Sequence, residues 1–392
     1  PILDMRNGAD QIQFMERSDL DDLAMRGTAS PDHVIRIKGR PLVLRKSAWS
    51  RGREAIKSVL EDYAEEYRAM FDRQVPLADQ PKTILPSDPK TIWMEDIGFI
   101  GLGRMGKPMA LNLARKGFDL AIFDINATPM QSFTEFNNCR QAADANDAIK
   151  DTDIAITVLP GPKEVEAVIL GSNCVIENLP AGAIIMDQST VLPETSDQLA
   201  RTARARGCHF VDAPIGRLAS HADTGESLFM VGAEDEDFKR VKPILDAMGT
   251  TVIHCGGPGT GTRSKLINNF LAIASCQLNA ECMALIQGFG LNLSTTLEVI
   301  HGTSATNGQL KMNYATKVLT GDIEPGFAID LAHKDLSLIV ESGNQSQIPM
   351  PMAAAAREIL SQARAADWGS KDFSALADFW CERSGVDKPR LK

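Results

Sequence analysis

The chain has 392 residues, of which 44% are hydrophobic, and carries a formal net charge of −10 at pH 7. This length predicts two or three domains, and the acidic balance argues against nucleic acid or an anionic membrane as the main partner. No uninterrupted apolar run reaches the length of a bilayer span. The N-terminal residues show no basic segment followed by an apolar one, so we expect no secretory signal.

Residues 1–95 differ in character from the rest of the chain. They are charged, contain few strand-like runs and show one amphipathic helix pattern, from about Arg51 to Arg73. The stretch from Pro76 to Pro89 is rich in proline and is predicted to be a linker. We therefore expect residues 1–95 to form an N-terminal extension of mainly helical and extended structure.

A glycine-rich turn follows in a strand–turn–helix context. The apolar run from Ile97 to Ile100 enters a Gly-x-Gly-x-x-Gly turn at Gly101, Gly103 and Gly106, and a helical pattern comes directly after it. The first glycine permits the tight turn, the second lets the backbone approach a pyrophosphate, and the third allows the helix to pack closely on the strand. We expect the whole turn to bind a dinucleotide, including the intervening residues Leu102, Arg104 and Met105.

A second strand, predicted from Leu120 to Phe123, ends at Asp124. An acid at this point accepts hydrogen bonds from the adenosine ribose hydroxyls, and its charge repels a 2′-phosphate. The alternative, a solvated acid at a strand end, is less consistent with the ordered motif around it. The sequence therefore predicts NAD, rather than NADP, as the cofactor.

Strands alternate with helices from residue 96 to 258, which is typical of a doubly wound parallel α/β sheet, the Rossmann fold. Ligands of such sheets bind at the carboxyl ends of strands, so Leu159, Pro160 and Thr190 are expected on the nicotinamide side. Ordinary turn chemistry is the alternative for each of these loops taken by itself. Further strands are predicted at Asp153–Leu159, Ala183–Asp187, Cys208–Asp212, Ser227–Val231 and Thr251–His254, and helices at Glu194–Arg206 and Glu236–Met248.

No strand pattern remains after Gly259, and we expect an all-α domain over residues 259–392. Its longest predicted helix runs from about Thr262 to Gly288. Shorter helices are predicted at Leu293–Ile300, Asp330–Gly343 and Met352–Ala366. No repeat of fixed period is visible.

Lys265, Asn268 and Asn269 open the long helix after four glycines between residues 256 and 261. Their spacing places the three side chains on one helical face. Hydride delivery to a carbonyl carbon requires an acid for the developing alkoxide, and a desolvated lysine can serve. A capping or solvated lysine is the alternative, and the upstream nucleotide motif makes the catalytic interpretation preferable.

The seven Cys are scattered without a CxxC pair, and the six His form no HxH or HExxH motif. Scattered thiols are typical of a reducing compartment, so a cytoplasmic location is expected. Because no metal-ligand spacing is present, we expect no metal site.

These residues together resemble the β-hydroxyacid dehydrogenases, which include 3-hydroxyisobutyrate dehydrogenase and tartronate semialdehyde reductase. The resemblance covers about residues 96–387 and depends on four ordered motifs: GFIGLGRMGKPMALNL, DAPIGR, KLINN and HKDL. It implies a Rossmann domain and an all-α domain joined by a long helix, in a homodimer or homotetramer. It also implies Lys265 as catalytic acid and base, assisted by Asn269, with Ser189, Thr190 and Lys334 at the cofactor.

One segment departs from the usual family pattern, Asp-Ala-Pro-Val-Ser-Gly-Gly. Here Gly216, Arg217 and Leu218 replace Ser-Gly-Gly. The planar fork of an arginine suits an oxyanion, and this change resembles the sulfolactaldehyde reductase branch of the family. In that branch a threonine usually follows the arginine, so Leu218 removes one expected hydrogen bond to a sulfonate. We assign Gly216, Arg217, Leu218 and Asn268 to substrate binding; a surface arginine, or one that reaches the cofactor, is the alternative for Arg217.

The N-terminal extension has a resemblance of its own, through Thr28–Leu42, Tyr63–Phe71 and Pro81–Leu85. These stretches are similar to the connector in fusions of a class II aldolase with a dehydrogenase. The metal-binding HxH of the aldolase is absent, so we expect no aldolase activity and a structural role for His33.

We therefore expect an NAD-dependent oxidoreductase that acts on a short anionic aldehyde or hydroxy acid, with 3-sulfolactaldehyde, reduced to 2,3-dihydroxypropane-1-sulfonate, as the favoured substrate. The alternatives are 3-hydroxyisobutyrate, 4-hydroxybutyrate or succinic semialdehyde, and tartronate semialdehyde. A nucleotide-binding sensor without turnover is a hypothesis of another class, and the intact Lys265 and asparagine pair argues against it. Oxidative decarboxylation, as in 6-phosphogluconate dehydrogenase, is a third.

Overall fold

The computed structural model describes residues 42–45, 91–94, 96–171 and 174–391. The predicted helix from Arg51 to Arg73 and the predicted linker from Pro76 to Pro89 lie outside these residues. Contacts divide the chain into two compact units, residues 1–156 with 173–185, and residues 157–172 with 186–392.

The first unit is built on a sheet whose strands have the order β7-β6-β3-β4-β5. β3 pairs with β4 and β4 with β5, both in parallel. Every residue of β3 and the first three of β6 are buried, as expected of apolar strands covered on both faces. The strands are β3 (Ile97–Ile100), β4 (Leu120–Phe123), β5 (Cys139–Gln141), β6 (Ile154–Thr157) and β7 (Ile184–Asp187), of which the last residues of β6 and β7 belong to the second unit.

Short elements complete this unit. A two-stranded parallel sheet joins β1 (Leu42–Arg45) to β2 (Thr91–Met94). The helices are α6 (Gly106–Arg115), α7 (Ala145–Ala148), α9 (Val175–Asn178) and the 3₁₀ turn η2 (Pro129–Phe133). The predicted strands β3 and β4 are confirmed at both ends, while β5, β1 and β2 were not predicted.

The sheet of the second unit has the order β11-β10-β8-β7. β10 pairs in parallel with β11, but it is antiparallel to β8 and to β9. The pairings among β3, β4 and β5 and between β10 and β11 are parallel, as predicted, whereas the two antiparallel pairings of β10 were not indicated by the sequence. The strands are β8 (His209–Asp212), β9 (Ile215–Gly216), β10 (Ser227–Gly232) and β11 (Gly249–Gly256), with helices α8 (Pro162–Leu170), α10 (Pro193–Ala205), α11 (Ala219–Asp223) and α12 (Asp235–Met248).

The connections before and after β10 differ in the elements that they contain. Residues 213–226 between β8 and β10 hold only the two-residue strand β9 and the five-residue helix α11. A parallel return normally needs a crossover with a full helix. The longer α12 supplies such a crossover between β10 and β11.

The rest of the second unit is helical, and no strand occurs among residues 259–391. Buried side chains from several helices form one core, including Ile273, Met283, Tyr314, Leu336 and Leu360. The predicted helices are confirmed to within two residues. The elements are α13 (Thr260–Gly288), α14 (Leu293–His301), α15 (Ile329–Gln345), α16 (Pro351–Ala365) and α17 (Leu376–Arg383), with the π-helical turn η3 (Gln309–Tyr314) and the 3₁₀ turns η4 (Val318–Thr320) and η5 (Phe373–Ala375).

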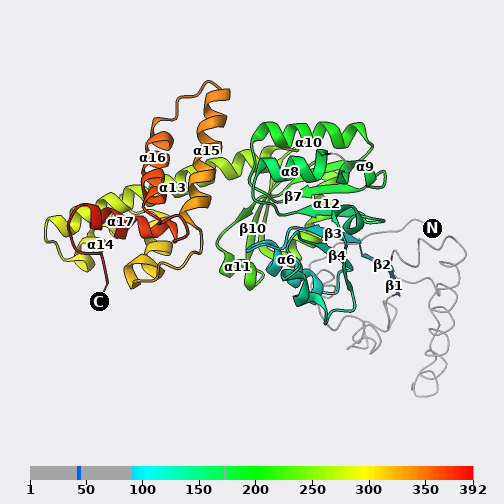
Figure 1. The fold of residues 1–392 in the computed structure, drawn as a ribbon, viewed down its shortest axis with the longest axis horizontal. Coiled ribbons are helices and arrows are strands. Elements are labelled where there is room, and N and C mark those ends of the chain that lie inside the picture. Colours follow the sequence, from blue (N-terminus) through cyan, green and yellow to red (C-terminus); the bar gives the residue numbers. More distant parts are fainter. Residues whose placement is uncertain (1–41, 46–90, 95, 172–173, 392) are drawn as a thin grey trace, which may run out of the picture. The chain divides into compact units, whose positions relative to one another are not determined.

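The long helix α13 dominates this part of the ribbon (Figure 1). Among the described residues it alone is long and apolar enough to cross a membrane by length and composition. Half of its most apolar stretch is buried in the structure, and it packs against α15, α16 and α17. These contacts are those of a core helix.

Candidate active site

Lys265 lies in the second turn of α13, partly buried. Its Nζ donates a hydrogen bond to the carbonyl oxygen of Ile215, at 2.6 Å. Burial lowers the pKa of the amine below its ordinary value; the charge of Asp335 opposes this shift and that of Lys334 adds to it. A lysine whose pKa is lowered gives up its proton more readily than an ordinary lysine, which suits a group that must both give and take a proton.

The two asparagines predicted beside Lys265 form a hydrogen-bonded chain. The Asn268 Nδ2 donates to the Asn269 Oδ1 at 3.1 Å. The Asn269 Nδ2 donates to the Asp335 Oδ2 at 2.6 Å, and both of these last two residues are buried. Asp335 therefore fixes which end of the Asn269 amide can face a ligand.

Asp335 was missed by the sequence prediction, although it stands inside the HKDL motif. An acid at helical spacing from the apolar Ala332, Leu338 and Ile339 was the signal that could have identified it. Its neighbour Lys334 lies 2.8 Å from the Asp335 Oδ1 and donates a hydrogen bond to the carbonyl oxygen of Thr190, at 3.2 Å. The predicted cofactor residues Lys334 and Thr190 are thus in contact.

A buried aspartate joins the two loops assigned to the nicotinamide side. The Asp187 Oδ1 accepts hydrogen bonds from the hydroxyls of Thr157, at 2.8 Å, and Ser189, at 2.6 Å. The Ser189 Oγ in turn accepts from the backbone N–H of Leu159, at 2.9 Å. Burial raises the pKa of Asp187. This network was not predicted; it holds Leu159 close to the loop of Thr190, and Pro160 follows Leu159 as an exposed residue.

The segment assigned to substrate binding follows β8. Arg217 adopts a left-handed backbone, with φ 72°. Its guanidinium donates to the carbonyl oxygen of Glu226 at 2.5 Å and to the hydroxyls of Thr250 and Thr251 at 2.9 and 3.0 Å. In this structure Arg217 thus ties its own segment to the edge of the sheet, and its predicted grip on an anion stays a prediction.

The neighbours of Arg217 pack closely on apolar and backbone groups. A Cβ at Gly216 would lie 3.1 Å from the Leu228 Cδ2, so the glycine lets these two strands approach. A Cβ at Gly326 would lie 3.6 Å from the Leu218 Cδ1. Leu218 therefore covers the loop that leads into α15, the helix of Lys334 and Asp335.

The dinucleotide motif lies in the first unit and has the geometry that its glycines predict. Gly101 has a φ of 98°, and a Cβ at Gly106 would lie 2.0 Å from the carbonyl oxygen of Gly101. Gly103 is exposed, and a Cβ there would meet no atom within 4 Å. The exposed Gly103 and Arg104 and the half-buried Met105 precede α6, whose N-terminus suits a phosphate.

Asp124 belongs to the same turn. Its Oδ2 accepts a hydrogen bond from the backbone N–H of Leu102 at 2.6 Å, and its Oδ1 accepts from that of Asn126 at 2.8 Å. Each carboxylate oxygen keeps a further lone pair, since an ionised carboxylate offers about four acceptor positions. The residues present therefore fit a dinucleotide with free ribose hydroxyls.

Three family models match the chain. The NAD-binding domain of 6-phosphogluconate dehydrogenase matches residues 96–257. The NAD-binding domain of NADP-dependent 3-hydroxyisobutyrate dehydrogenase matches residues 259–380. The second domain of class II aldolases matches residues 1–112.

Curated proteins and solved structures match over nearly their whole length. The chain is 42% identical over 285 residues to 3-sulfolactaldehyde reductase of Escherichia coli (strain K12). This match covers 73% of this chain and 95% of that protein. It is 35% identical over 295 residues to 2-(hydroxymethyl)glutarate dehydrogenase of Eubacterium barkeri, spanning 74% and 96%. The structure of Mycobacterium tuberculosis 3-hydroxyisobutyrate dehydrogenase with L-serine matches with a TM-score of 0.67 and 26% identity, over 73% of this chain and 99% of that one.

Proposed function

Because this chain belongs to the β-hydroxyacid dehydrogenases, the NAD-dependent family of 3-hydroxyisobutyrate dehydrogenase, we propose that it interconverts a short anionic aldehyde and its alcohol. The favoured reaction is the reduction of 3-sulfolactaldehyde to 2,3-dihydroxypropane-1-sulfonate. The observation that carries the proposal is the Lys265 amine, partly buried and with a lowered pKa, one helical turn from the Asn268–Asn269 pair.

In the proposed reduction, bound NADH supplies the hydride to the carbonyl carbon. Lys265 gives a proton to the carbonyl oxygen as negative charge develops there, and then regains a proton from solvent. The balance is one aldehyde, one NADH and one proton consumed, and one alcohol and one NAD⁺ formed. In the oxidative direction the neutral amine takes the hydroxyl proton.

The proposed roles of the other residues follow from their contacts. Asn269, oriented by Asp335, donates a hydrogen bond to the substrate, or accepts one from it, beside Lys265. Lys334, Thr190, Leu159 and Pro160 hold the nicotinamide end of the cofactor. The glycine turn holds the pyrophosphate, and the Asp124 carboxylate holds the ribose hydroxyls and disfavours NADP.

The sulfonate is proposed on two grounds. The chain is 42% identical to 3-sulfolactaldehyde reductase, and Gly216 and Arg217 occupy the segment expected at the anion. In this proposal Arg217 exchanges part of its contact with Glu226, Thr250 and Thr251 for the sulfonate oxygens. The carboxylate substrates 3-hydroxyisobutyrate, succinic semialdehyde and tartronate semialdehyde are the competing candidates.

A screen of NADH oxidation tests the proposal. The substrates are 3-sulfolactaldehyde and the semialdehydes of succinate, methylmalonate and tartronate, each with NADPH in a parallel reaction. We expect the highest kcat/KM with 3-sulfolactaldehyde and a preference for NADH. A higher kcat/KM with a carboxylate substrate would show that the carboxylate, and not the sulfonate, is the preferred substrate. Binding of NADH without its oxidation in the presence of any of these aldehydes would favour the nucleotide sensor.

We further propose a homodimer or homotetramer. Along α13 the large apolar side chains Ile267, Leu271, Leu278 and Leu285 are each more than half exposed. Their spacing keeps them close to one helical face. Light scattering coupled to size exclusion should give a mass at least twice that of the chain, and a monomer at micromolar concentration would refute the proposal.

A further inference from the structure

The buried carboxylate of Asp212 holds the start of α13. Asp212 ends strand β8 and is fully buried. Its Oδ1 accepts a hydrogen bond from the backbone N–H of Gly259 and its Oδ2 from that of Thr262, both at 2.6 Å. The first N–H groups of a helix have no partner within the helix, and a carboxylate complements the positive end of the helix dipole.

Glycines make this junction tight. A Cβ at Gly261 would lie 2.3 Å from the carbonyl oxygen of Met230 and 2.7 Å from that of Asp212. A Cβ at Gly232 would lie 2.3 Å from the Asp212 Oδ1. The first turn of α13 thus lies directly on the ends of β8 and β10, and small displacements at this point are resisted by backbone contacts.

Lys265 follows Thr262 by one helical turn, and its Nζ bonds to the carbonyl oxygen of Ile215, three residues after Asp212. The short segment from Asp212 to Ile215 therefore contacts both the helix start and the catalytic amine. We propose that Asp212 is a positioning residue for the proposed reaction: by holding the Gly259 and Thr262 N–H groups, its carboxylate sets the place of the Lys265 amine. This inference rests on the proposed function.

The charged groups around Asp212 are few. Arg263, on α13, is one of them. Its hydrogen bonds to Asp197 on α10 are the main cause of its raised pKa, and the charge of Asp212 adds to the shift. The residues of β10 at the junction, Met230 and Gly232, carry no charge. Burial raises the pKa of Asp212 to about 6 against the pull of its hydrogen bonds. Once protonated, the carboxyl turns one oxygen from acceptor into donor, and one backbone bond to α13 is weakened.

The test replaces Asp212 by asparagine. In Asp212→Asn an amide NH₂ stands where one oxygen accepted an N–H, so one of the two bonds is lost. We expect kcat to fall about 100-fold, as for a misplacement of ~1 Å in an oriented site, with the KM for NADH unchanged. We also expect the pH midpoint for acetylation of the Lys265 amine, followed by peptide mass spectrometry, to rise toward that of an ordinary lysine.

Two further variants separate positioning from general damage. Asp197→Asn removes the ion pair with Arg263 at the same helix end but leaves both backbone bonds, and should keep the wild-type kcat and midpoint. Gly261→Ala pushes the helix start away from β10 while Asp212 stays, and should reproduce both changes. A wild-type kcat and a wild-type Lys265 midpoint in Asp212→Asn would overturn the proposal.

If Asp212→Asn fails to fold, the pH dependence of the wild-type enzyme still tests the proposal. Its kcat should fall as the pH is lowered through about 6 while the KM for NADH stays constant, and a flat kcat from pH 5 to 7 would overturn the proposal. The acetylation readout needs no substrate. A chain that oxidises no NADH with any aldehyde would refute the proposed function, and the Lys265 midpoint would still test the role of Asp212.

Discussion

The Lys265 amine is acted on by two charges of opposite sign. Burial lowers its pKa most, the charge of Asp335 opposes this shift, and the charge of Lys334 adds to it. The same two residues pair with each other, with 2.8 Å between the Lys334 Nζ and the Asp335 Oδ1. A change at either partner is therefore expected to alter the pKa of the Lys265 amine as well.

The first prediction concerns Lys265 itself. Lys265→Ala should lower the rate of aldehyde reduction by about 10² to 10⁴-fold, the usual contribution of a general acid, and leave NADH binding intact. In the wild-type enzyme, reduction requires the protonated amine. Its rate should fall as the pH rises through the lowered pKa of Lys265, while alcohol oxidation rises.

Steady-state rates in both directions and NADH fluorescence titration measure these effects. Lys239→Ala, which changes an exposed lysine paired only with acids, is the matched control. Near-normal turnover in Lys265→Ala would exclude the acid–base role.

The second prediction concerns Arg217. Arg217→Ser should reduce kcat/KM for 3-sulfolactaldehyde by about 10- to 100-fold, the value of a hydrogen bond to a charged group, and affect 3-hydroxyisobutyrate much less. Thr250→Val keeps the arginine and removes one of its protein acceptors, so it controls for loosening of the sheet edge. Equal losses with both substrates would refute a sulfonate-specific role.

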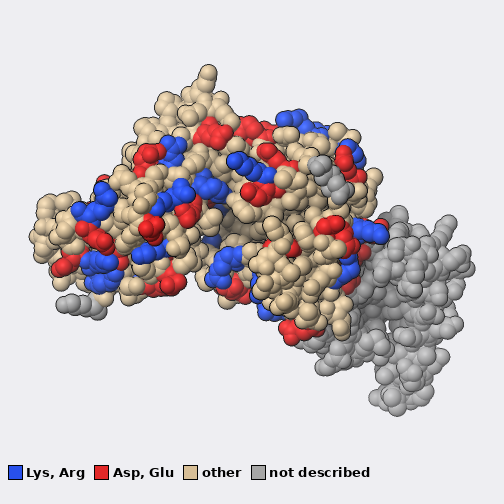
Figure 2. Space-filling model, viewed as in Figure 1, with Lys and Arg blue, Asp and Glu red and all other residues tan. Residues whose placement is uncertain are grey.

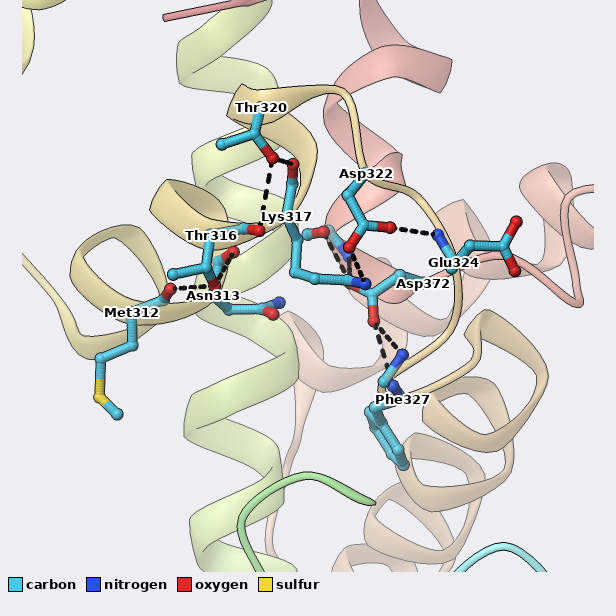
Figure 3. Close-up of polar contacts among 11 residues, drawn as sticks. Met312, Asn313, Thr316, Lys317, Thr320, Asp322, Glu324, Phe327 and Asp372 are labelled. Carbon is cyan, nitrogen blue, oxygen red and sulfur yellow. Dashed lines mark hydrogen bonds and ion pairs between the residues drawn. The ribbon is translucent and has the colours of Figure 1, made fainter. Parts of the chain in front are cut away.

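At the scale of elements, the loop between η4 and α15 is held at both ends (Figure 3). Lys317 pairs with Asp322, whose other oxygen accepts from the N–H of Glu324. The buried Asp372 accepts from the N–H groups of Gly326 and Phe327, at 2.9 and 3.1 Å. This loop contacts Leu218 and leads into the helix of Lys334 and Asp335, so its position bears on the site.

The third prediction follows from these contacts. Asp372→Ala removes the acceptor of both loop N–H groups and of the N–H and hydroxyl of Ser374. Buried donors left unpaired are costly, and the free energy of unfolding should fall by about 3–5 kcal/mol. Asp322→Ala removes an exposed ion pair and the acceptor of the exposed Glu324 N–H in the same loop, and should cost about 1 kcal/mol or less. Urea unfolding measures both, and equal small losses would contradict the account.

At the scale of the whole molecule, acidic and basic side chains are interspersed over the face drawn in Figure 2. Most of the ion pairs that the structure describes are exposed, and pairs of this kind contribute little to stability. The buried carboxylates affect stability differently, because burial removes the water that would stabilise their ionised form. Ionised Asp212 therefore lowers stability while it secures the helix start.

The fourth prediction is a pH dependence of stability. The pKa of Asp212 is about 6 in the folded protein, against 3.8 for an ordinary aspartate. Between these values the folded state binds more protons than the unfolded state, so the free energy of unfolding falls as the pH rises. The contribution of this group amounts to about 3 kcal/mol. Compared with Asp212→Asn by urea unfolding from pH 4 to 7, the wild type should lose more stability; parallel curves would contradict the shifted pKa.

The sequence by itself determined the local structure wherever the pattern was periodic or needed a glycine. β3, β4 and the helices α13 to α16 follow from apolar spacing, and the turn at Gly101 follows from conformations that only glycine adopts readily. The family followed from the order of these motifs. Lys265, Asn268 and Asn269 could be grouped in advance because residues three and four apart share a helical face.

Only the tertiary structure decided which distant groups meet. Asp335 orients Asn269 from a helix 66 positions away, Asp212 holds α13 from 47 and 50 positions away, and Arg217 donates to Thr250 and Thr251. β10 is antiparallel to β8, and the connection between them holds the strand β9 and the short helix α11 instead of a full crossover helix. The physical reason is the same in each case: periodicity and turn chemistry act over a few residues, whereas buried charges are placed by packing that brings remote segments together.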